Sequence, residues 1–150
     1  MQFDMDLSLG FILNRTSIQS KALFTQKIKE FDISPEQWSL VFRVVESNGL
    51  TQKELSDSTY KDQANITRSI DRLERKGLLK RVSNQMDRRI INIYPTEKAI
   101  NLVEKIIPIS SRFNNYLTEN FTEEEKNQLI KLLNKVYENL LKGDINESKK

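Results

Sequence analysis

Residues 62–89 read DQANITRSIDRLERKGLLKRVSNQMDRR, and this stretch predicts two consecutive structural elements. In its first half, Ile66, Ile70 and Leu73 recur at intervals of four and three residues, which is the spacing of one apolar stripe on a helix. Asp62 is a favourable N-cap, and Gly77 stands where a left-handed C-cap belongs. We therefore expect a helix over residues 62–76 with a polar and basic face opposite the stripe.

The second half of the stretch predicts a β-hairpin. Leu79 and Val82 open a short strand, residues 83–87 form a polar turn, and Ile91 and Ile93 alternate with polar residues in a return strand. A polar-faced helix followed by a basic-tipped hairpin indicates a winged helix-turn-helix. In that arrangement the helix, residues 62–76, fits a DNA major groove, and the wing, residues 83–90, reaches the adjacent minor groove or the backbone.

Charge is concentrated in the same stretch. Residues 61–89 hold nine Lys or Arg and four Asp or Glu, a net charge of +5, whereas the whole chain carries +3. A polyanion-binding face requires such local basicity. The alternative is that these charges only solvate a helix and a hairpin, and charge alone does not separate the two interpretations.

The flanking sequence predicts further helices. Ser34-Pro35 starts a helix with an apolar stripe at Trp38, Val41, Phe42 and Val45, and a capping box at residues 51–54 opens a short helix before the turn that ends at Asp62. Two helices joined by a short turn form the helix-turn-helix element. Long helices are expected over residues 7 to about 30 and 96 to about 120, the second with Pro108 inside it, and a last helix begins at Thr122.

The residue pattern of the central stretch resembles the MarR family of bacterial transcription regulators. The residues that carry the resemblance are Thr67, Arg68, Leu73, Glu74, Gly77 and Leu78 in the helix, and Asp87 and Arg89 in the wing. Pro95-Thr96 stands where the family has a leucine-threonine step, and Ala99 where it has a glycine. These departures concern the entry to the next helix, and the resemblance covers almost the whole chain.

The resemblance implies a mainly α fold with a small β-hairpin wing, that is, a winged helix-turn-helix core plus long terminal dimerisation helices. The expected boundaries are a single MarR-like chain over 1–150, with the core at 34–95, dimerisation helices at 1–33 and 96–142, and a flexible tail at 143–150. Burial between two chains would cover the apolar surface of the terminal helices, so we expect a symmetric homodimer. The alternative, a monomeric bundle closed by the same helices, stays open on sequence alone.

The function expected from these features is that of a sequence-specific DNA-binding transcriptional regulator. We expect a dimeric repressor on a palindromic, double-stranded operator, released by a small aromatic or anionic effector. The alternative is a winged-helix protein-interaction module without DNA binding, against which the basic stretch and the wing motif weigh.

The expected DNA contacts divide by element. On the helix, Arg68 suits guanine and Asn65 adenine, while Arg72 suits phosphate. In the wing, the family pattern sends Arg89 into the minor groove, oriented by Asp87. The full predicted set is Lys61, Gln63, Asn65, Thr67, Arg68, Arg72, Asp87, Arg88 and Arg89.

Regulators of this type often carry a ligand pocket, and three residues are candidates for it. Trp38 and Phe42 could stack on an aromatic carboxylate whose charge pairs with Arg15. The alternative, core packing plus a surface arginine, is favoured by the residues alone.

Composition excludes several other functions. The chain has no Cys and no His, which removes disulfides, thiol chemistry, Ser-His and Cys-His catalysis and the commonest transition-metal ligand. With four glycines and no phosphate loop, we expect no enzyme, no catalytic residues, no metal and no cofactor. No apolar run approaches the roughly 18 residues of a membrane span, and MQFDMD lacks the cations of a secretory signal, so a cytoplasmic, non-membrane protein is expected.

Overall fold

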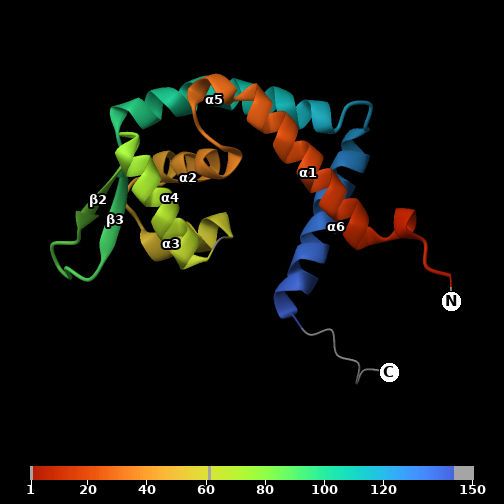
Figure 1. The fold of residues 1–150 in the computed structure, drawn as a ribbon, viewed down its shortest axis with the longest axis horizontal. Coiled ribbons are helices and arrows are strands. Elements are labelled where there is room, and N and C mark those ends of the chain that lie inside the picture. The colour runs from red at the N-terminus through yellow and green to blue at the C-terminus, as the bar shows by residue number, and fades with distance from the viewer. Residues whose placement is uncertain (1, 61, 144–150) are drawn as a thin grey trace. The chain divides into compact units, whose positions relative to one another are not determined.

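The computed structural model describes residues 2–60 and 62–143, and it confirms the expected fold class, mainly helical with a small antiparallel sheet (Figure 1). The chain forms two compact units, one up to Ser111 and one from Arg112. The elements are two 3-10 turns, η1 (Met5–Leu7) and η2 (Lys29–Phe31), and, in chain order, α1 (Leu9–Lys27), α2 (Pro35–Glu46), β1 (Leu50–Thr51), α3 (Gln52–Thr59), α4 (Gln63–Arg75), β2 (Leu79–Ser83), β3 (Ile91–Pro95), α5 (Glu97–Leu117) and α6 (Glu123–Lys142).

Two predicted capping boxes set the starts of the helices before α4. At α2, the Gln37 amide N–H donates to Ser34 Oγ at 3.1 Å, and the Ser34 N–H donates back to Gln37 Oε1 at 3.3 Å. At α3, Glu54 and Thr51 make the same reciprocal pair at 3.1 and 3.2 Å. Each box satisfies two backbone donors that have no partner within the helix, which fixes where the helix begins.

Helix α4 is built as its sequence predicts. Ile66, Ile70 and Leu73 are all fully buried. The Asp62 carboxylate accepts the Asn65 N–H at 2.9 Å and so caps the N-terminus. At the other end Gly77 has φ +73°, and the N–H groups of residues 77 and 78 donate to the carbonyls of residues 74 and 73, which is a Schellman ending. The chain therefore turns sharply out of α4 into β2.

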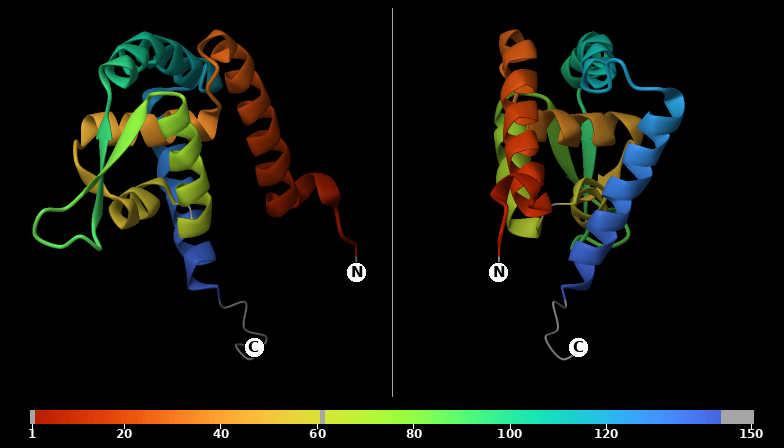
Figure 2. Two further views of the ribbon diagram at one scale, coloured as in Figure 1. Left: turned by 60° about the vertical axis from the view of Figure 1, so that its left-hand side comes forward. Right: turned by 90° about the vertical axis from the view of Figure 1, so that its right-hand side faces the viewer.

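The sheet has the strand order β1-β3-β2 and is antiparallel throughout. Arg81 lies opposite Ile93 in the predicted hairpin, which extends beyond the helices of the first unit to a loop at its tip (Figure 2). The two-residue strand β1 was not expected from the sequence. It pairs Leu50 with Ile93, and the Asn92 side chain adds a hydrogen bond to the Gly49 carbonyl at 2.8 Å.

The buried residues of α2 differ from the apolar stripe that the sequence predicts for this helix. Leu40, Val41 and Val44 are the fully buried residues, whereas Trp38 and Phe42 are only half-buried. The reason is that α2 contacts α1, α3 and β3, so that more than one of its sides is covered. The two aromatic rings are left at the margin of the core.

The expected first helix is divided into η1, α1 and η2, and ends at Asp32, which has φ +52°. Its C-terminal end is anchored by Phe24 and Ile28, which are buried. Further towards the N-terminus, Phe11 and Ile18 are exposed. Apolar surface at the N-terminal end of α1 is therefore left uncovered by the described residues.

The second unit contains helix α6, whose N-cap is Thr122 as predicted. None of the residues of α6 is buried, although its sequence is rich in leucine. Gly143, with φ +62°, ends the helix, and the rest of the predicted tail, residues 144–150, lies outside the described residues. The exposed apolar residues of α6 are Leu129, Ile130, Leu132, Leu133, Tyr137, Leu140 and Leu141.

Candidate nucleic-acid interface

The outward face of α4 carries most of the predicted contacts. Its side chains are exposed because the three apolar anchors hold the opposite face in the core. Lys61, predicted to contact phosphate, lies outside the described residues. The residues on the exposed face are Gln63, Asn65, Thr67, Arg68 and Arg72.

Three of the side chains at the start of α4 form a hydrogen-bonded series. The Asn65 amide Nδ2 donates to Asp62 Oδ2 at 2.7 Å, and its Oδ1 accepts from Arg68 Nη2 at 2.5 Å. Both ends of the Asn65 amide are therefore engaged within the protein. Arg68 uses one of five N–H donors in this contact, so its guanidinium is oriented and still able to donate to another group.

Thr67 connects α4 to α3. Its hydroxyl accepts from Gln52 Nε2 at 2.7 Å and donates to the Gln63 carbonyl at 2.9 Å. The hydroxyl proton is thereby used inside the protein. Gln52 was not among the predicted site residues, because its position as the first residue of α3 gives no signal of a cross-helix contact.

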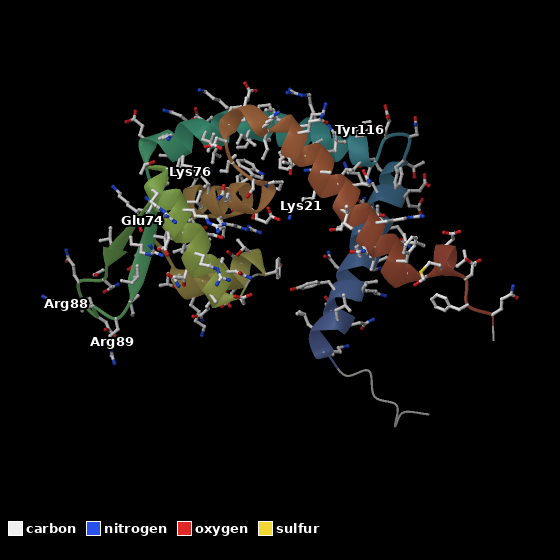
Figure 3. All side chains as sticks on the ribbon, in the orientation of Figure 1. Lys21, Glu74, Lys76, Arg88, Arg89 and Tyr116 are labelled. Atoms are coloured by element: carbon white, nitrogen blue, oxygen red, sulfur yellow. The ribbon has the colours of Figure 1, made fainter. Side chains whose placement is uncertain are left out.

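The wing residues Asp87 and Arg89 form the expected pair. The Asp87 carboxylate accepts from Arg89 Nε and Nη2, both at 3.1 Å, and from the Arg89 backbone N–H at 3.0 Å. These bonds to the Arg89 side chain and backbone lower the pKa of Asp87. The Arg89 side chain is 91% exposed, and Figure 3 shows Arg88 and Arg89 at the far end of the hairpin, directed away from the core.

A cavity of about 450 Å³ lies between the start of α3, the start of α4 and the wing. Among the described residues, its polar lining includes Lys53, Gln63 and Arg89 and no acidic side chain. Sequence reasoning missed Lys53, since a lone exposed lysine in a helix carries no pattern. The geometry brings a cation of α3 together with a predicted helix contact and a predicted wing contact.

A second cavity, of about 360 Å³, contains two of the three predicted effector residues. The Trp38 and Phe42 rings are 5.5 Å apart with an interplanar angle of 52°, and both line the cavity between α2 and α5. Arg15 is absent from the lining, and its guanidinium lies 5.6 Å from the centre of the Phe11 ring. The cation that does line the cavity is Arg43, which also pairs with Glu46 at 3.0 Å.

No helix among residues 2–60 and 62–143 combines the length and the apolar character needed to cross a membrane. The same residues contain no group of three or more acidic side chains arranged to hold a metal ion.

Comparisons with known proteins agree with this geometry. Residues 31–90 match the family model described as MarR family. An uncharacterised HTH-type transcriptional regulator of Bacillus subtilis (strain 168), YybA, is 28% identical over 118 residues, which cover 76% of each chain.

Solved structures are similar over nearly the whole chain. The S. aureus MepR–DNA complex is 26% identical with a TM-score of 0.82, covering 90% of this chain and 98% of that one. A mutant of E. coli MarR complexed with operator DNA is 25% identical with the same TM-score, covering 91% and 98%. Bordetella bronchiseptica BpsR, whose DNA binding is regulated by 6-hydroxynicotinic acid, has a TM-score of 0.86 at 21% identity, covers 91% and 98%, and shows the fold alone.

Proposed function

Because the chain belongs to the MarR family of transcriptional regulators, we propose that it is a dimeric repressor that binds a palindromic operator. The observation that carries the proposal is the exposed basic face of α4 lying beside the Arg89 wing. An α-helix fits the major groove, and a hairpin tip reaches the adjacent minor groove. The two similar structures solved with DNA support DNA binding by this chain.

In this function Arg68 reads a base, and the residues around it have supporting roles. A guanidinium pairs bidentately with guanine, and the bond from Arg68 Nη2 to Asn65 Oδ1 orients this one on the exposed face of α4. Arg72 is exposed one turn further along α4 and suits a phosphate. Arg89 then enters the minor groove, where width and A·T content are read.

In this function the cavity between α3 and the wing holds the DNA sugar-phosphate backbone that separates the major groove from the adjacent minor groove. The strand passing from the major groove to the adjacent minor groove must run between the recognition helix and the wing. Lys53 and Arg89 both line the cavity, and the described residues of its lining include no carboxylate that would repel a phosphate. Lys53 is thus added to the set of proposed phosphate contacts.

Dimerisation is proposed from the two terminal helices. Phe11 and Ile18 on α1 and the leucines of α6 are exposed in the single chain. Exposed apolar surface of this extent marks an interaction site, and a symmetric pair of chains would place two α4 helices on the two halves of a palindrome.

The cavity between α2 and α5 is the proposed effector site, for an aromatic carboxylate. Trp38 and Phe42 offer ring faces, and Arg43 replaces Arg15 as the cation within reach. The assay is quenching of Trp38, the only tryptophan in the chain, by benzoate. Saturable quenching that Arg43→Gln abolishes and Arg15→Ala leaves intact is expected. The reverse pattern would return the role to Arg15.

Selection of bound duplexes from a random DNA pool tests the function as a whole. We expect an inverted repeat whose half-sites are about 10 base pairs apart, centre to centre. Binding should weaken steeply with salt, since phosphate contacts release counterions. No enrichment, together with salt-independent binding, would favour the protein-interaction alternative. Arg68→Ala should abolish the enrichment, while Lys135→Ala, on α6, should leave it unchanged.

A further inference from the structure

The side chain of Arg81, at the base of the wing, joins β2 to α4. Its Nη1 lies 2.7 Å from Asp71 Oδ1 and also donates to Glu74 Oε1, and its Nη2 donates to the Thr67 carbonyl at 3.2 Å. The Arg81 backbone N–H adds a bond to Glu74 Oε2 at 3.3 Å. The Arg81 brace, meaning Arg81 with Asp71 and Glu74, therefore connects a strand and a helix by four contacts (Figure 3 shows Glu74 on α4 beside the hairpin).

The partial burial of these side chains favours a fixed orientation of the Arg81 guanidinium. The Arg81 side chain is 22% exposed, and the side chains of Asp71 and Glu74 are 49% and 35% exposed. Partial burial reduces screening by solvent, and a guanidinium that bonds three acceptors at once has little freedom to rotate. A single exposed ion pair would contribute little, but this is a network with a backbone carbonyl in it.

The Arg81 brace contacts α4 and the wing close to the proposed DNA contacts. Thr67, whose carbonyl it holds, immediately precedes Arg68, and Arg81 lies in the strand that continues into the wing loop. Both DNA-contacting elements are thus fixed to one guanidinium. On the basis of the proposed function, we propose that Arg81 is a positioning residue that holds the wing at a set distance from α4, so that Arg68 and Arg89 reach adjacent grooves together.

A second effect of Arg81 must be separated from positioning. Asp71 and Glu74 are carboxylates on the helix that approaches DNA, and Arg81 also neutralises them. Arg81→Met would therefore weaken DNA binding by repulsion as well as by loosening the wing. The triple variant Asp71→Asn/Glu74→Gln/Arg81→Met removes all three charges, so that repulsion disappears while the connection stays broken.

The experiment measures how strongly Arg89→Ala acts in each background. Affinity and its salt dependence are measured on the duplex that the wild-type chain selects from a random pool. In the wild type, Arg89→Ala should lower the salt slope by about 0.9 for each phosphate charge no longer neutralised. In the Arg81→Met chain and in the triple variant the same change should alter the slope and the affinity much less, because the wing is no longer held in place. Arg68→Ala should keep its full effect in every background.

Control variants separate positioning from loss of charge or of folding. Lys80→Met removes a cation from the neighbouring position of β2, whose side chain is exposed, and should leave the Arg89→Ala effect intact. Arg81→Lys keeps the charge but lacks the planar guanidinium fork that reaches all three acceptors at once, so it should reduce the Arg89→Ala effect. This variant keeps the test available if Arg81→Met does not fold. Circular dichroism of each variant reports its folding.

Two failures remain distinct. If the wild-type chain selects no duplex, the proposed function fails and the positioning role fails with it. If the wild type binds and Arg89→Ala has the same effect in the wild-type, Arg81→Lys and triple-variant backgrounds, DNA binding stands and the positioning role of Arg81 is overturned.

Discussion

Asn65→Ala gives the sharpest test of how α4 reads DNA. The Asn65 side chain uses both ends of its amide inside the protein, one on Asp62 and the other on Arg68. We therefore predict that Asn65 acts through Arg68 and does not read a base of its own. Its removal should weaken discrimination at the same base pair that Arg68→Ala affects.

The expected magnitude follows from the contacts. Fixing an arginine side chain costs up to about 2 kcal/mol of rotamer free energy, part of which Asn65 offsets before DNA arrives. A net hydrogen bond contributes about 0.5–1.5 kcal/mol, with the lower half of that range expected at this exposed position. Asn65→Ala should thus cost about 0.5–1 kcal/mol per half-site, roughly two- to fivefold in affinity, against about 1–3 kcal/mol for Arg68→Ala.

The assay is equilibrium binding to a panel of operators, each with one base pair changed. The double variant Asn65→Ala/Arg68→Ala should bind like Arg68→Ala alone, because Asn65 then has nothing to position. If Asn65→Ala removed discrimination at a base pair where Arg68→Ala kept it, Asn65 would be a base reader and the reasoning would be refuted.

Three further predictions concern assembly, stability and the wing. Leu133→Glu should convert a dimer into a monomer by placing a charge in the buried seam, as measured by light scattering, and a wild-type monomer at micromolar concentration would contradict the premise. Gly77→Ala should lower the free energy of unfolding by about 1 kcal/mol because its φ is +73°, whereas Gly10→Ala in exposed α1 should raise it by a similar amount, both measured in urea at one protein concentration. The pKa of Asp87 is lowered by its bonds from Arg89, so the stabilisation of the wing by this pair should be complete above the ordinary aspartate range and be lost as the pH falls through the lowered pKa; Arg89→Ala should raise that pKa in an NMR titration, and an unchanged value would count against the pair.

The sequence was most informative where local rules decide the structure. The caps at Ser34, Thr51 and Thr122 and the left-handed ending at Gly77 depend on residues within four positions of each other, and all were predicted. The apolar stripe of α4 was equally plain because only one side of that helix is covered.

Contacts between distant segments were not predictable in the same way. Strand β1 has two residues and depends on a partner more than forty positions later, so no periodicity reveals it. The Arg81 brace is similar, since Arg81 was counted as one cation of a basic stretch and its engagement by Asp71 and Glu74 is a property of the fold. The predicted effector set stays a prediction, and Arg43 could not be singled out from the sequence because helix periodicity does not show that it borders the cavity beside Trp38 and Phe42.

The pairing of β1 with β3 also bears on the order in which the chain folds. The bond from the Thr96 hydroxyl to the Gly77 carbonyl closes a loop of only 19 positions, whereas the bond from Asn92 to the Gly49 carbonyl spans 43. Short loops close at a lower entropic cost, so the hairpin and its junction with α5 should form early, and β1 should attach after the rate-limiting step. Weakening the attachment would then accelerate unfolding while hardly changing the folding rate. Strand β1 would thus form late in folding, and its pairing with β3 would determine how long the wing keeps its position before the chain unfolds.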